Sequence, residues 1–202
     1  MLTIALPKGR IADETLDRFE KAFGEKFVFE DRKLILEKSG FKFLNVRNQD
    51  VPTYVMHGAA DLGVVGLDVL EEKEYDLIKL LDLKLGRCKV AFGLRAGEKL
   101  NFDKSKITIA TKHEKIAKKY FEQKAMAVEI IKLYGSTELA PLVGLCDCIV
   151  DIVETGETMK QNGLEVGPTI METTAHLIAN KNSFYAKKDL IFDLKDKLEK
   201  FL

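Results

Sequence analysis

The segment DIVETGETMKQNG, residues 151–163, combines an apolar run with residue types that can bind an anion. Ile149–Val153 has the composition of a buried strand, and Glu154-Thr155-Gly156-Glu157-Thr158 follows it as a short turn. A strand that leads through a glycine turn into a helix presents several backbone N–H groups in one direction, at the positive end of the helix dipole. Thr155 and Thr158 can add hydroxyl donors, and Gly156 permits a close approach or a positive φ. The pattern therefore predicts a nest for a phosphate monoester.

The carboxylates of this segment need a separate explanation. Asp151, Glu154 and Glu157 would repel a bare phosphate, but carboxylates accept hydrogen bonds from hydroxyls and bind hard cations. A ligand with both a phosphate and vicinal hydroxyls, such as a ribose 5-phosphate, satisfies both halves of the pattern. A surface turn in which the two threonines only cap a helix is the structural alternative. The GxxxxGK[ST] loop of nucleoside triphosphatases is absent.

Short apolar strands and amphipathic helices alternate along the chain and must position this turn. The alternation favours parallel sheets covered by helices. We expect strands at 2–6, 41–46, 61–66, 89–95, 106–111, 127–133 and 146–153, and extended segments at 166–171 and 175–179. We expect helices after Arg10 (with Leu16, Phe19 and Phe23 on one face), at 51–58, 67–74 and 112–124, after a cap at Ser136 or Thr137, and at 190–202.

Two segments share a pattern that indicates an internal repeat. Gly58-Ala-Ala-Asp61 and Gly144-Leu-Cys-Asp147 each place an aspartate three residues after a glycine and just before a strand. Chance also gives such a match, so the pattern alone leaves the number of lobes open. Two related α/β lobes would form a cleft at the carboxyl ends of their strands, where ligands bind in open α/β sheets.

The composition excludes several classes of protein. The 202 residues contain 32 Lys+Arg and 32 Asp+Glu, without the basic excess of a nucleic-acid binder. The apolar start is too short for a signal peptide, and no window approaches the roughly 20 apolar residues of a membrane span. Cys88, Cys146 and Cys148 are too few for a disulfide framework and are interpreted as reduced thiols, which indicates the cytoplasm. The three histidines match no zinc spacing, and His57 and His176 are interpreted as structural.

Segment 151–163 resembles the phosphoribosyl pyrophosphate signature of the ATP phosphoribosyltransferase family, the first enzyme of histidine biosynthesis. Four further segments resemble the family in the same order: ALPKGR at 5–10, VRNQDVPTYVMHGAADLGVVGLDVL at 46–70, LGRCKVAFG at 85–93 and GSTELAPLVGLCDCIVDIV at 135–153. The chain ends after one helix at Leu202 and so resembles the family's short form. The resemblance covers most of the chain.

The resemblance implies an α/β fold of the periplasmic-binding-protein type with two lobes, each a mostly parallel sheet flanked by helices, and an active site in the cleft. Residues 1–88 and 173–202 would form lobe I, and 89–172 would form lobe II, which binds phosphoribosyl pyrophosphate. The chain would cross between the lobes near Arg87–Val90 and near Glu172. A histidyl-tRNA-synthetase-like regulatory subunit is the implied partner, with a homodimer of this chain inside a hetero-oligomer.

The implied reaction joins N1 of ATP to C1 of the ribose and expels pyrophosphate, through an oxocarbenium-like transition state as in glycoside cleavage. By resemblance, Glu154–Thr158 hold the 5-phosphate, and Asp151 and Glu138 bind the ribose hydroxyls. The assignment of Glu138 has an alternative, because a glutamate in a first helical turn often only complements the helix dipole. N1 of adenine is itself a nucleophile, so we expect no general base.

Cations are expected to neutralise the phosphates. Arg47 and Arg32 resemble the family's arginines that face pyrophosphate, and arginine suits this role because its planar fork binds two oxygens at once. Arg32 has the looser match. Lys8 is expected to be catalytic, and the nucleotide would be contacted by Arg10, Gly66 and Asp68, although Gly66 can also simply start a helix. Mg²⁺ is expected on the substrate and not on a protein metal site. The alternative function is a two-lobed binding or effector-sensing module without catalysis.

Overall fold

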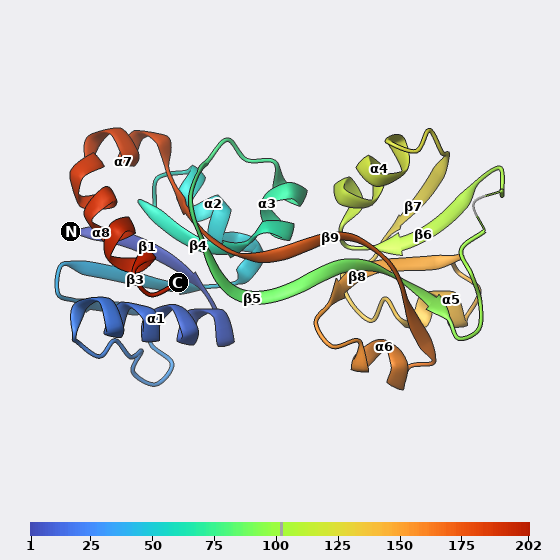
Figure 1. Ribbon diagram of the computed structural model, residues 1–202, viewed down its shortest axis with the longest axis horizontal. Helices are drawn as coiled ribbons and strands as arrows, with labels where there is room; N and C mark the ends of the chain where they lie inside the picture. The colour runs from blue at the N-terminus through green and yellow to red at the C-terminus, as the bar shows by residue number, and fades with distance from the viewer. Residues whose placement is uncertain (102) are drawn as a thin grey trace. The chain divides into compact units, whose positions relative to one another are not determined.

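The computed structural model describes residues 1–101 and 103–202, and it divides into two compact units. Unit 1 comprises Met1–Gly86 and Thr174–Leu202, and unit 2 comprises Arg87–Thr173. Two long strands, β5 (Ile78–Arg95) and β9 (Leu164–Ala179), run from one unit into the other (Figure 1). No helix among the described residues is both long enough and apolar enough to cross a membrane.

The strands form one nine-stranded mixed sheet, whose part in unit 1 has the order β2-β3-β1-β4-β9-β5. The strands of unit 1 besides β5 and β9 are β1 (Leu2–Pro7), β2 (Ile35–Lys38), β3 (Phe41–Val46) and β4 (Leu62–Gly66). Its helices are α1 (Arg10–Phe23), the 3₁₀ helix η1 (Asn48–Asp50), α2 (Val51–Met56), α3 (Leu67–Lys73), α7 (Lys181–Ala186) and α8 (Lys188–Glu199). β1 is parallel to β3 and β4, whereas β2 at the edge pairs antiparallel with β3, and β9 pairs antiparallel with β4.

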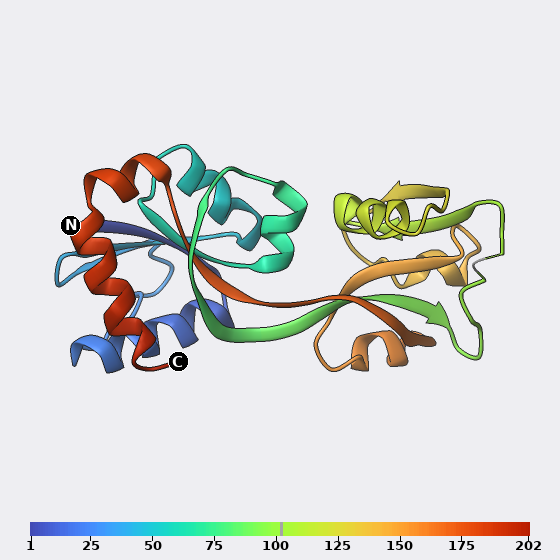
Figure 2. The same cartoon turned by 45° about the horizontal axis from the view of Figure 1, so that its top comes forward.

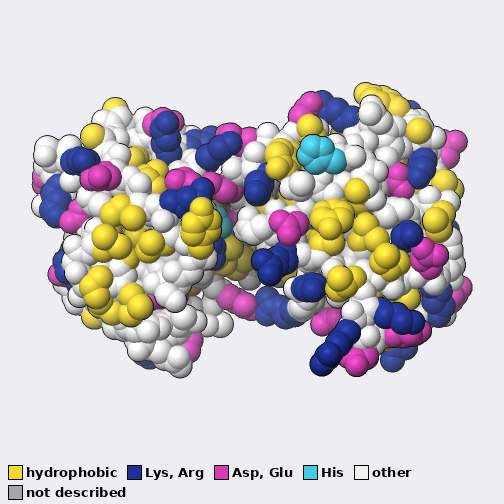
Figure 3. Space-filling view, turned by 180° about the vertical axis from the view of Figure 1, so that it is seen from behind, with side chains coloured by type: hydrophobic (Ala, Val, Ile, Leu, Met, Phe, Trp, Pro, Cys, Tyr) yellow, Lys and Arg dark blue, Asp and Glu magenta, His cyan; other side chains and the backbone are white. Residues whose placement is uncertain are grey.

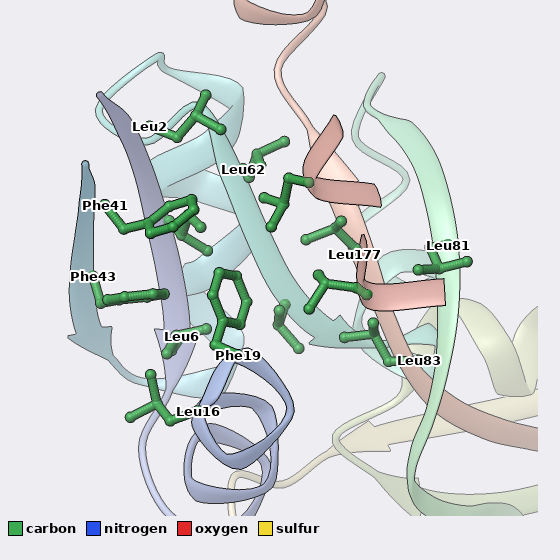
Figure 4. Packing of buried hydrophobic residues seen from close by; sticks show 14 of the residues in the cluster. Leu2, Leu6, Leu16, Phe19, Phe41, Phe43, Leu62, Leu81, Leu83 and Leu177 are labelled. Carbon is green, nitrogen blue, oxygen red and sulfur yellow. The ribbon is translucent and has the colours of Figure 1, made fainter. Parts of the chain in front are cut away.

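The helices of unit 1 bury apolar stripes on both faces of this sheet. In α1 the buried residues Ala12, Thr15, Leu16 and Phe19 recur at helical spacing, and they pack with α8 against one face of the sheet. Figure 2 shows α1 and α8 together on that face, and α2 and α3 away from it. Phe19 lies at the centre of this core, with its ring 5.1 Å from that of Phe43 and 5.4 Å from that of Phe41, both edge to face (Figure 4). Each such pair contributes about 0.5–1.5 kcal/mol beyond the buried area.

Unit 2 repeats the arrangement with a sheet in the order β5-β8-β6-β7. Its elements are β6 (Ile107–Thr111), α4 (Glu114–Glu122), β7 (Val128–Lys132), α5 (Leu139–Leu142), β8 (Cys148–Val153) and α6 (Glu157–Gln161). β6 is parallel to β7 and β8, and β5 pairs antiparallel with β8. One face of the sheet is covered by α4 and the other by α5 and α6.

The structure confirms the α/β fold, and most expected elements begin and end within about two residues of their predicted bounds. The predicted strand at 89–95 is the last part of the longer β5, and the segments at 166–171 and 175–179 are one strand, β9. The sheets were expected to be mostly parallel, but each unit also contains antiparallel pairs. These pairs are β2 with β3 and β4 with β9 in unit 1, and β5 with β8 in unit 2. β2 and α7 were not expected.

The capping role expected for Ser136 or Thr137 is wrong. The residue before α5 is Glu138, and no side chain of the described residues caps this helix. The hydroxyl of Thr137 instead donates to the carboxylate of Asp151.

The three cysteines are free thiols, with Cys146 and Cys148 buried and Cys88 half-buried. Lys and Arg side chains are interspersed with Asp and Glu on the face shown in Figure 3, as the equal counts of both charges suggest.

The internal repeat is present in the structure. Asp61 precedes β4 and Asp147 precedes β8, and each aspartate binds the backbone of the parallel neighbour, β1 or β6. Gly58 and Gly144 both have a positive φ, of 72° and 75°. The order β3-β1-β4 in unit 1 thus corresponds to β7-β6-β8 in unit 2.

Candidate active site

In unit 2, the turn after β8 has the conformation that an anion nest needs. Gly156 immediately precedes α6 with a φ of +82°, a left-handed conformation that side chains with a Cβ rarely adopt. A Cβ at this position would also lie 2.9 Å from Cγ2 of Val166. The N–H of Glu157 donates to Oγ1 of Thr155 over 3.3 Å. Only a glycine therefore fits here without strain, and the turn leaves Glu154, Thr155, Glu157 and Thr158 exposed to solvent.

Asp151 lies three residues before this turn and is largely buried, with 14% of its side chain exposed. Its Oδ1 is 2.9 Å from Nζ of Lys112, and its Oδ2 accepts from the hydroxyl of Thr137 over 2.7 Å. Burial raises the pKa of Asp151, but the charge of Lys112 and the hydrogen bonds outweigh it, so that its pKa is lowered. Asp151 is therefore ionised at neutral pH and can accept hydrogen bonds.

Glu138 is brought close to Asp151 through the chain. It follows Thr137, whose hydroxyl binds Asp151, and it is half-buried just before α5. The sequence separates Glu138 from Asp151 by 13 residues. The fold thus brings two of the residues predicted to bind ribose hydroxyls into one neighbourhood.

In unit 1, the predicted cations follow the carboxyl ends of neighbouring strands. Lys8 follows β1 and Arg47 follows β3, and the N–H of Lys8 donates to the carbonyl of Val46 over 2.8 Å. Both side chains belong to residues exposed to solvent. Parallel pairing of β1 with β3 places these two residues at the same edge of the sheet.

Arg32 reaches the same edge from the other direction. It precedes β2, and β2 runs antiparallel to β3 with Ile35 opposite Leu44. The N–H of Asn45 donates to the carbonyl of Leu34 over 2.8 Å, which fixes the segment after Arg32 beside the end of β3. The structure therefore brings Arg32 to the edge that carries Arg47, although 15 residues separate them in sequence.

The residues predicted to contact the nucleotide begin two helices at this edge. Arg10 is the first residue of α1, and its Nε lies 3.4 Å from Oε1 of Glu14. Gly66 ends β4 and precedes α3 with a φ of −63°, and Asp68 is buried in the first turn of that helix. The φ of Gly66 is open to any residue, so its conformation agrees with the simple interpretation of a helix start.

The candidate loops of the two units occupy corresponding positions. Gly66 follows Asp61 by five residues, as Ile152 follows Asp147, so that Asp68 corresponds to Glu154. Both loops lie at the carboxyl ends of strands, the usual place for ligands in open α/β sheets. A hollow of about 200 Å³ in unit 2 is instead lined by the end of β5, by residues that follow it and by Ile107 and Asp147 at the starts of β6 and β8. Asp147 binds the backbone of β6 there, and the hollow lies away from the carboxyl ends of β6 and β8, so we assign the site to the other edge.

Comparison with known proteins identifies the family. The family model described as ATP phosphoribosyltransferase matches residues 47–200. The ATP phosphoribosyltransferase of Wolinella succinogenes is 66% identical over 200 residues, which cover 99% of this chain and 97% of that protein. The chain belongs to the ATP phosphoribosyltransferase family.

Three solved structures support the same assignment at the level of fold. The ATP phosphoribosyltransferase (HisG:HisZ) complex from Thermotoga maritima contains a chain that is 36% identical, with a TM-score of 0.85 over 99% of this chain and 98% of that one. The GluR0 ligand-binding core from Nostoc punctiforme is 14% identical, with a TM-score of 0.59 over 99% of this chain and 92% of that one. The second likeness shows the fold alone, as does that to the substrate binding protein of an amino acid ABC transporter, which is 12% identical with a TM-score of 0.61 over 98% of this chain and 91% of that one. The fold is therefore of the two-lobed binding-protein type.

Members of the ATP phosphoribosyltransferase family are pentosyltransferases. They transfer the 5-phosphoribosyl group of phosphoribosyl pyrophosphate to N1 of ATP, release pyrophosphate and thereby begin histidine biosynthesis. The reaction requires a grip on the sugar phosphate and cations for the leaving group. The two edges described above offer these two kinds of chemistry, one in each unit.

Lys112 and Thr137 both contact Asp151, and neither was predicted as a site residue from the sequence. Their positions in the sequence predict only the start of a helix for Lys112 and a cap for Thr137. The register of β6 with β8, in which Thr111 pairs with Val150, places Lys112 beside Asp151. Asp151 was the feature of the sequence that could have predicted such contacts, because a carboxylate at the end of a buried strand requires a cation or hydrogen-bond donors nearby.

Proposed function

We propose that this chain carries out the reaction of its family with the sugar phosphate held by unit 2 and the phosphate-binding cations supplied by unit 1. The observation that carries this proposal is the position of the ionised Asp151 three residues before the Gly156 turn, at the end of one strand. A carboxylate beside a nest of N–H groups matches a ligand that carries hydroxyls and a phosphate.

The Glu154–Thr158 turn binds the 5-phosphate of the ribose. The exposed backbone at the start of α6 and the hydroxyls of Thr155 and Thr158 are the donors, and Gly156 gives the turn its shape. Asp151 accepts a hydrogen bond from a ribose hydroxyl, and Glu138 accepts from the same diol. This assignment of residues 89–172 to phosphoribosyl pyrophosphate, and of 1–88 with 173–202 to the cations and the nucleotide, stays a prediction.

Arg47, Arg32 and Lys8 neutralise the departing pyrophosphate. Their common edge in unit 1 supports this role, because three positive charges at neighbouring strand ends attract a polyanion. Charge grows on the leaving group toward the transition state, so an arginine that meets it there accelerates the reaction. Arg10, Gly66 and Asp68 are assigned to ATP on the weaker ground of their position at the same edge.

Mg²⁺ fits this arrangement as an ion carried by the substrate. Among residues 1–101 and 103–202 no group of three or more His, Cys, Asp or Glu side chains could hold a metal. Mg²⁺ usually keeps several waters and binds through substrate phosphates with one or two carboxylates. On the pyrophosphate, the ion would bind phosphate oxygens and waters and would offset part of the charge.

Assembly with a HisZ-type regulatory subunit, like histidyl-tRNA synthetase in fold, is part of the proposal. The Thermotoga maritima structure is a HisG:HisZ complex, and this chain aligns with 98% of its matching chain. We also propose a homodimer of this chain within the hetero-oligomer. The free thiols support a cytoplasmic location.

A turnover assay with a binding control tests the proposal. The protein is mixed with ATP, phosphoribosyl pyrophosphate, Mg²⁺ and a pyrophosphatase, and the absorbance of phosphoribosyl-ATP is followed with and without a HisZ-type subunit. Formation of product supports the enzyme, and Asp151→Asn should weaken calorimetric binding of phosphoribosyl pyrophosphate. Binding of both substrates without turnover, even with the subunit present, would leave only the effector-sensing alternative.

A further inference from the structure

The carboxylate of Asp151 is held by donors from three separate segments. Its Oδ1 accepts from the N–H of Ile152 over 2.7 Å and lies 2.9 Å from Nζ of Lys112. Its Oδ2 accepts from the hydroxyl of Thr137 over 2.7 Å. These donors come from β8 itself, from the end of β6 and from the segment before α5. An ionised carboxylate only accepts hydrogen bonds, so the direction of the bond from Thr137 is fixed.

The hydroxyl of Thr137 is committed to this contact. Thr137 is buried, with 1% of its surface exposed, and α5 has no cap from a described side chain. A threonine that precedes a helix usually spends its hydroxyl on the first N–H groups of that helix. Here the hydroxyl turns to a carboxylate 14 residues away. The contact therefore serves Asp151 and not the local helix.

The partners leave Asp151 with limited capacity for a ligand. A carboxylate offers about four lone-pair directions. Among the described contacts, Ile152 and Lys112 occupy the two at Oδ1, and Thr137 occupies one at Oδ2. One direction at Oδ2 is left, which is enough to accept one hydroxyl.

We propose that Thr137 and Lys112 are positioning residues that hold Asp151 so that Oδ2 accepts a hydrogen bond from one hydroxyl of the ribose phosphate. The inference rests on the proposed function, since it assumes that Asp151 meets the sugar. Neither residue needs to touch the substrate for this effect. Thr137 fixes the rotation of the carboxylate, and Lys112 keeps it charged.

Titratable groups approach Asp151 from the neighbouring elements of unit 2. Lys112 approaches from the end of β6, and Nε2 of His113, just before α4, lies 3.8 Å from Oδ1. β5 contributes Ala91 opposite Asp151, and the segment before α5 contributes Thr137 with Glu138 after it. Loss of either donor raises the pKa of Asp151, so Asp151 is protonated at a higher pH than in the wild type.

A double-mutant cycle on ribose 5-phosphate binding tests the proposal. Titration calorimetry is performed on the full chain with Thr137→Val, Lys112→Met, Asp151→Asn and the two double variants that include Asp151→Asn. Thr137→Val and Lys112→Met should each weaken binding by about 5- to 20-fold. In the Asp151→Asn background the same changes should alter affinity less than about twofold, because their action passes through the carboxylate. Thr137→Ser and Lys112→Arg, which keep the donors, should recover most of the affinity.

The pH profile and a matched control complete the test. The pH below which ribose 5-phosphate binding weakens should be higher in Thr137→Val than in the wild type. His113 is present in all variants, so the comparison isolates the titration of Asp151. Thr174→Val removes another hydroxyl that donates to an aspartate, Asp82, over 2.8 Å, and should leave binding unchanged. The side chain of Lys112 is 37% exposed, so Lys112→Met should fold. It therefore tests the positioning role even if Thr137→Val does not fold.

Three outcomes have separate meanings. Equal losses in the wild-type and Asp151→Asn backgrounds would overturn the positioning role, and for Lys112 they would show a direct contact with the ligand. An unchanged affinity in both single variants would overturn it as well. An unchanged affinity in Asp151→Asn would instead refute the proposed place of the ribose, on which the inference rests.

Discussion

Asp61 and Asp147 make the same pair of backbone hydrogen bonds in the two units. The N–H of Thr3 donates to Oδ2 of Asp61 over 2.9 Å, and the N–H of Asp61 donates to the carbonyl of Thr3 over 2.8 Å. Thr108 and Asp147 repeat both bonds, each over 2.9 Å. Each aspartate also pairs with a lysine, Lys187 at 2.7 Å and Lys104 at 2.5 Å. The contact joins the start of β4 to β1 and the start of β8 to β6.

Asp61→Ala should destabilise unit 1 by about 1–3 kcal/mol, because it leaves the amide of Thr3 and the ammonium of Lys187 without their acceptor. Asp147→Ala should cost less, since 29% of the Asp147 side chain is exposed against 10% for Asp61. Hydrogen exchange of amides in β3 and β7, which do not bind the substituted aspartates, measures the stability of each unit separately. Asp61→Asn keeps a hydrogen-bond acceptor, so its loss of stability should lie between zero and that of Asp61→Ala. Asp196→Ala, on the exposed side of α8, is the control and should leave the stability unchanged. Equal effects at both aspartates would contradict the role of burial.

Gly156→Val should abolish phosphoribosyl pyrophosphate binding and leave the rest of the fold intact. The positive φ costs a Cβ-bearing residue about 1–2 kcal/mol, and the new side chain meets Val166. Titration calorimetry gives the affinity, and circular dichroism checks the fold. Gly163→Ala is the matched control, because Gly163 also has a positive φ of 72°, but a Cβ there would have no described atom within 4 Å beyond its chain neighbours. It should lose stability and keep its affinity; a Gly156→Val variant that binds normally would show that the nest lies elsewhere.

Arg47→Ala should lower kcat far more than it weakens binding of ribose 5-phosphate. The reason is that charge on the pyrophosphate grows toward the transition state, so the lost interaction is made mainly there. Steady-state kinetics and calorimetry separate the two quantities. Lys118→Ala removes a charge from the exposed surface of α4 and should change neither. Equal losses of kcat and of affinity would remove Arg47 from this role.

Asp82 should make unit 1 sensitive to acid. Burial raises the pKa of Asp82, but the side chain and backbone amide of Lys84 and the hydroxyl of Thr174 outweigh it and lower the pKa to about 2. Because the folded pKa lies below the unfolded value of 3.8, this stabilisation is present above about pH 4 and is lost as the pH falls toward 2. Asp82→Asn should be less stable than the wild type at pH 6, and the difference should shrink between pH 4 and pH 2. Denaturant midpoints across this range check it, and a constant difference would contradict it.

Regular elements with clear periodicity were predictable from the sequence. β3 was placed at its observed bounds, and α1 was recognised because Leu16 and Phe19 recur at helical spacing. β2 escaped detection because it is a short edge strand whose residues are mostly exposed. β9 was divided because Glu172-Thr173-Thr174 has the composition of a loop. In the sheet β9 lies between β4 and β5, and this non-local pairing keeps the strand extended through its polar residues, which local composition does not encode.

The candidate site was predictable where it is local in sequence. The Gly156 turn and Asp151 lie in one segment, so their proximity followed from the chain itself. The partners of Asp151 depend on the register of β6 with β8 and on the path of the chain before α5. A single sequence does not fix that register, and Lys112 and Thr137 were therefore given local helical roles.

The discontinuity of unit 1 affects the order in which the chain is completed on the ribosome. Unit 2 has been synthesised in full at residue 173, whereas unit 1 still lacks the end of β9, α7 and α8. Until α8 leaves the exit tunnel, the apolar side chains of β1 and α1 lack the helix that covers them. Segments translated early therefore wait for segments translated much later, and a nascent chain stalled before residue 188 exposes the apolar surface of an incomplete domain to chaperones and proteases.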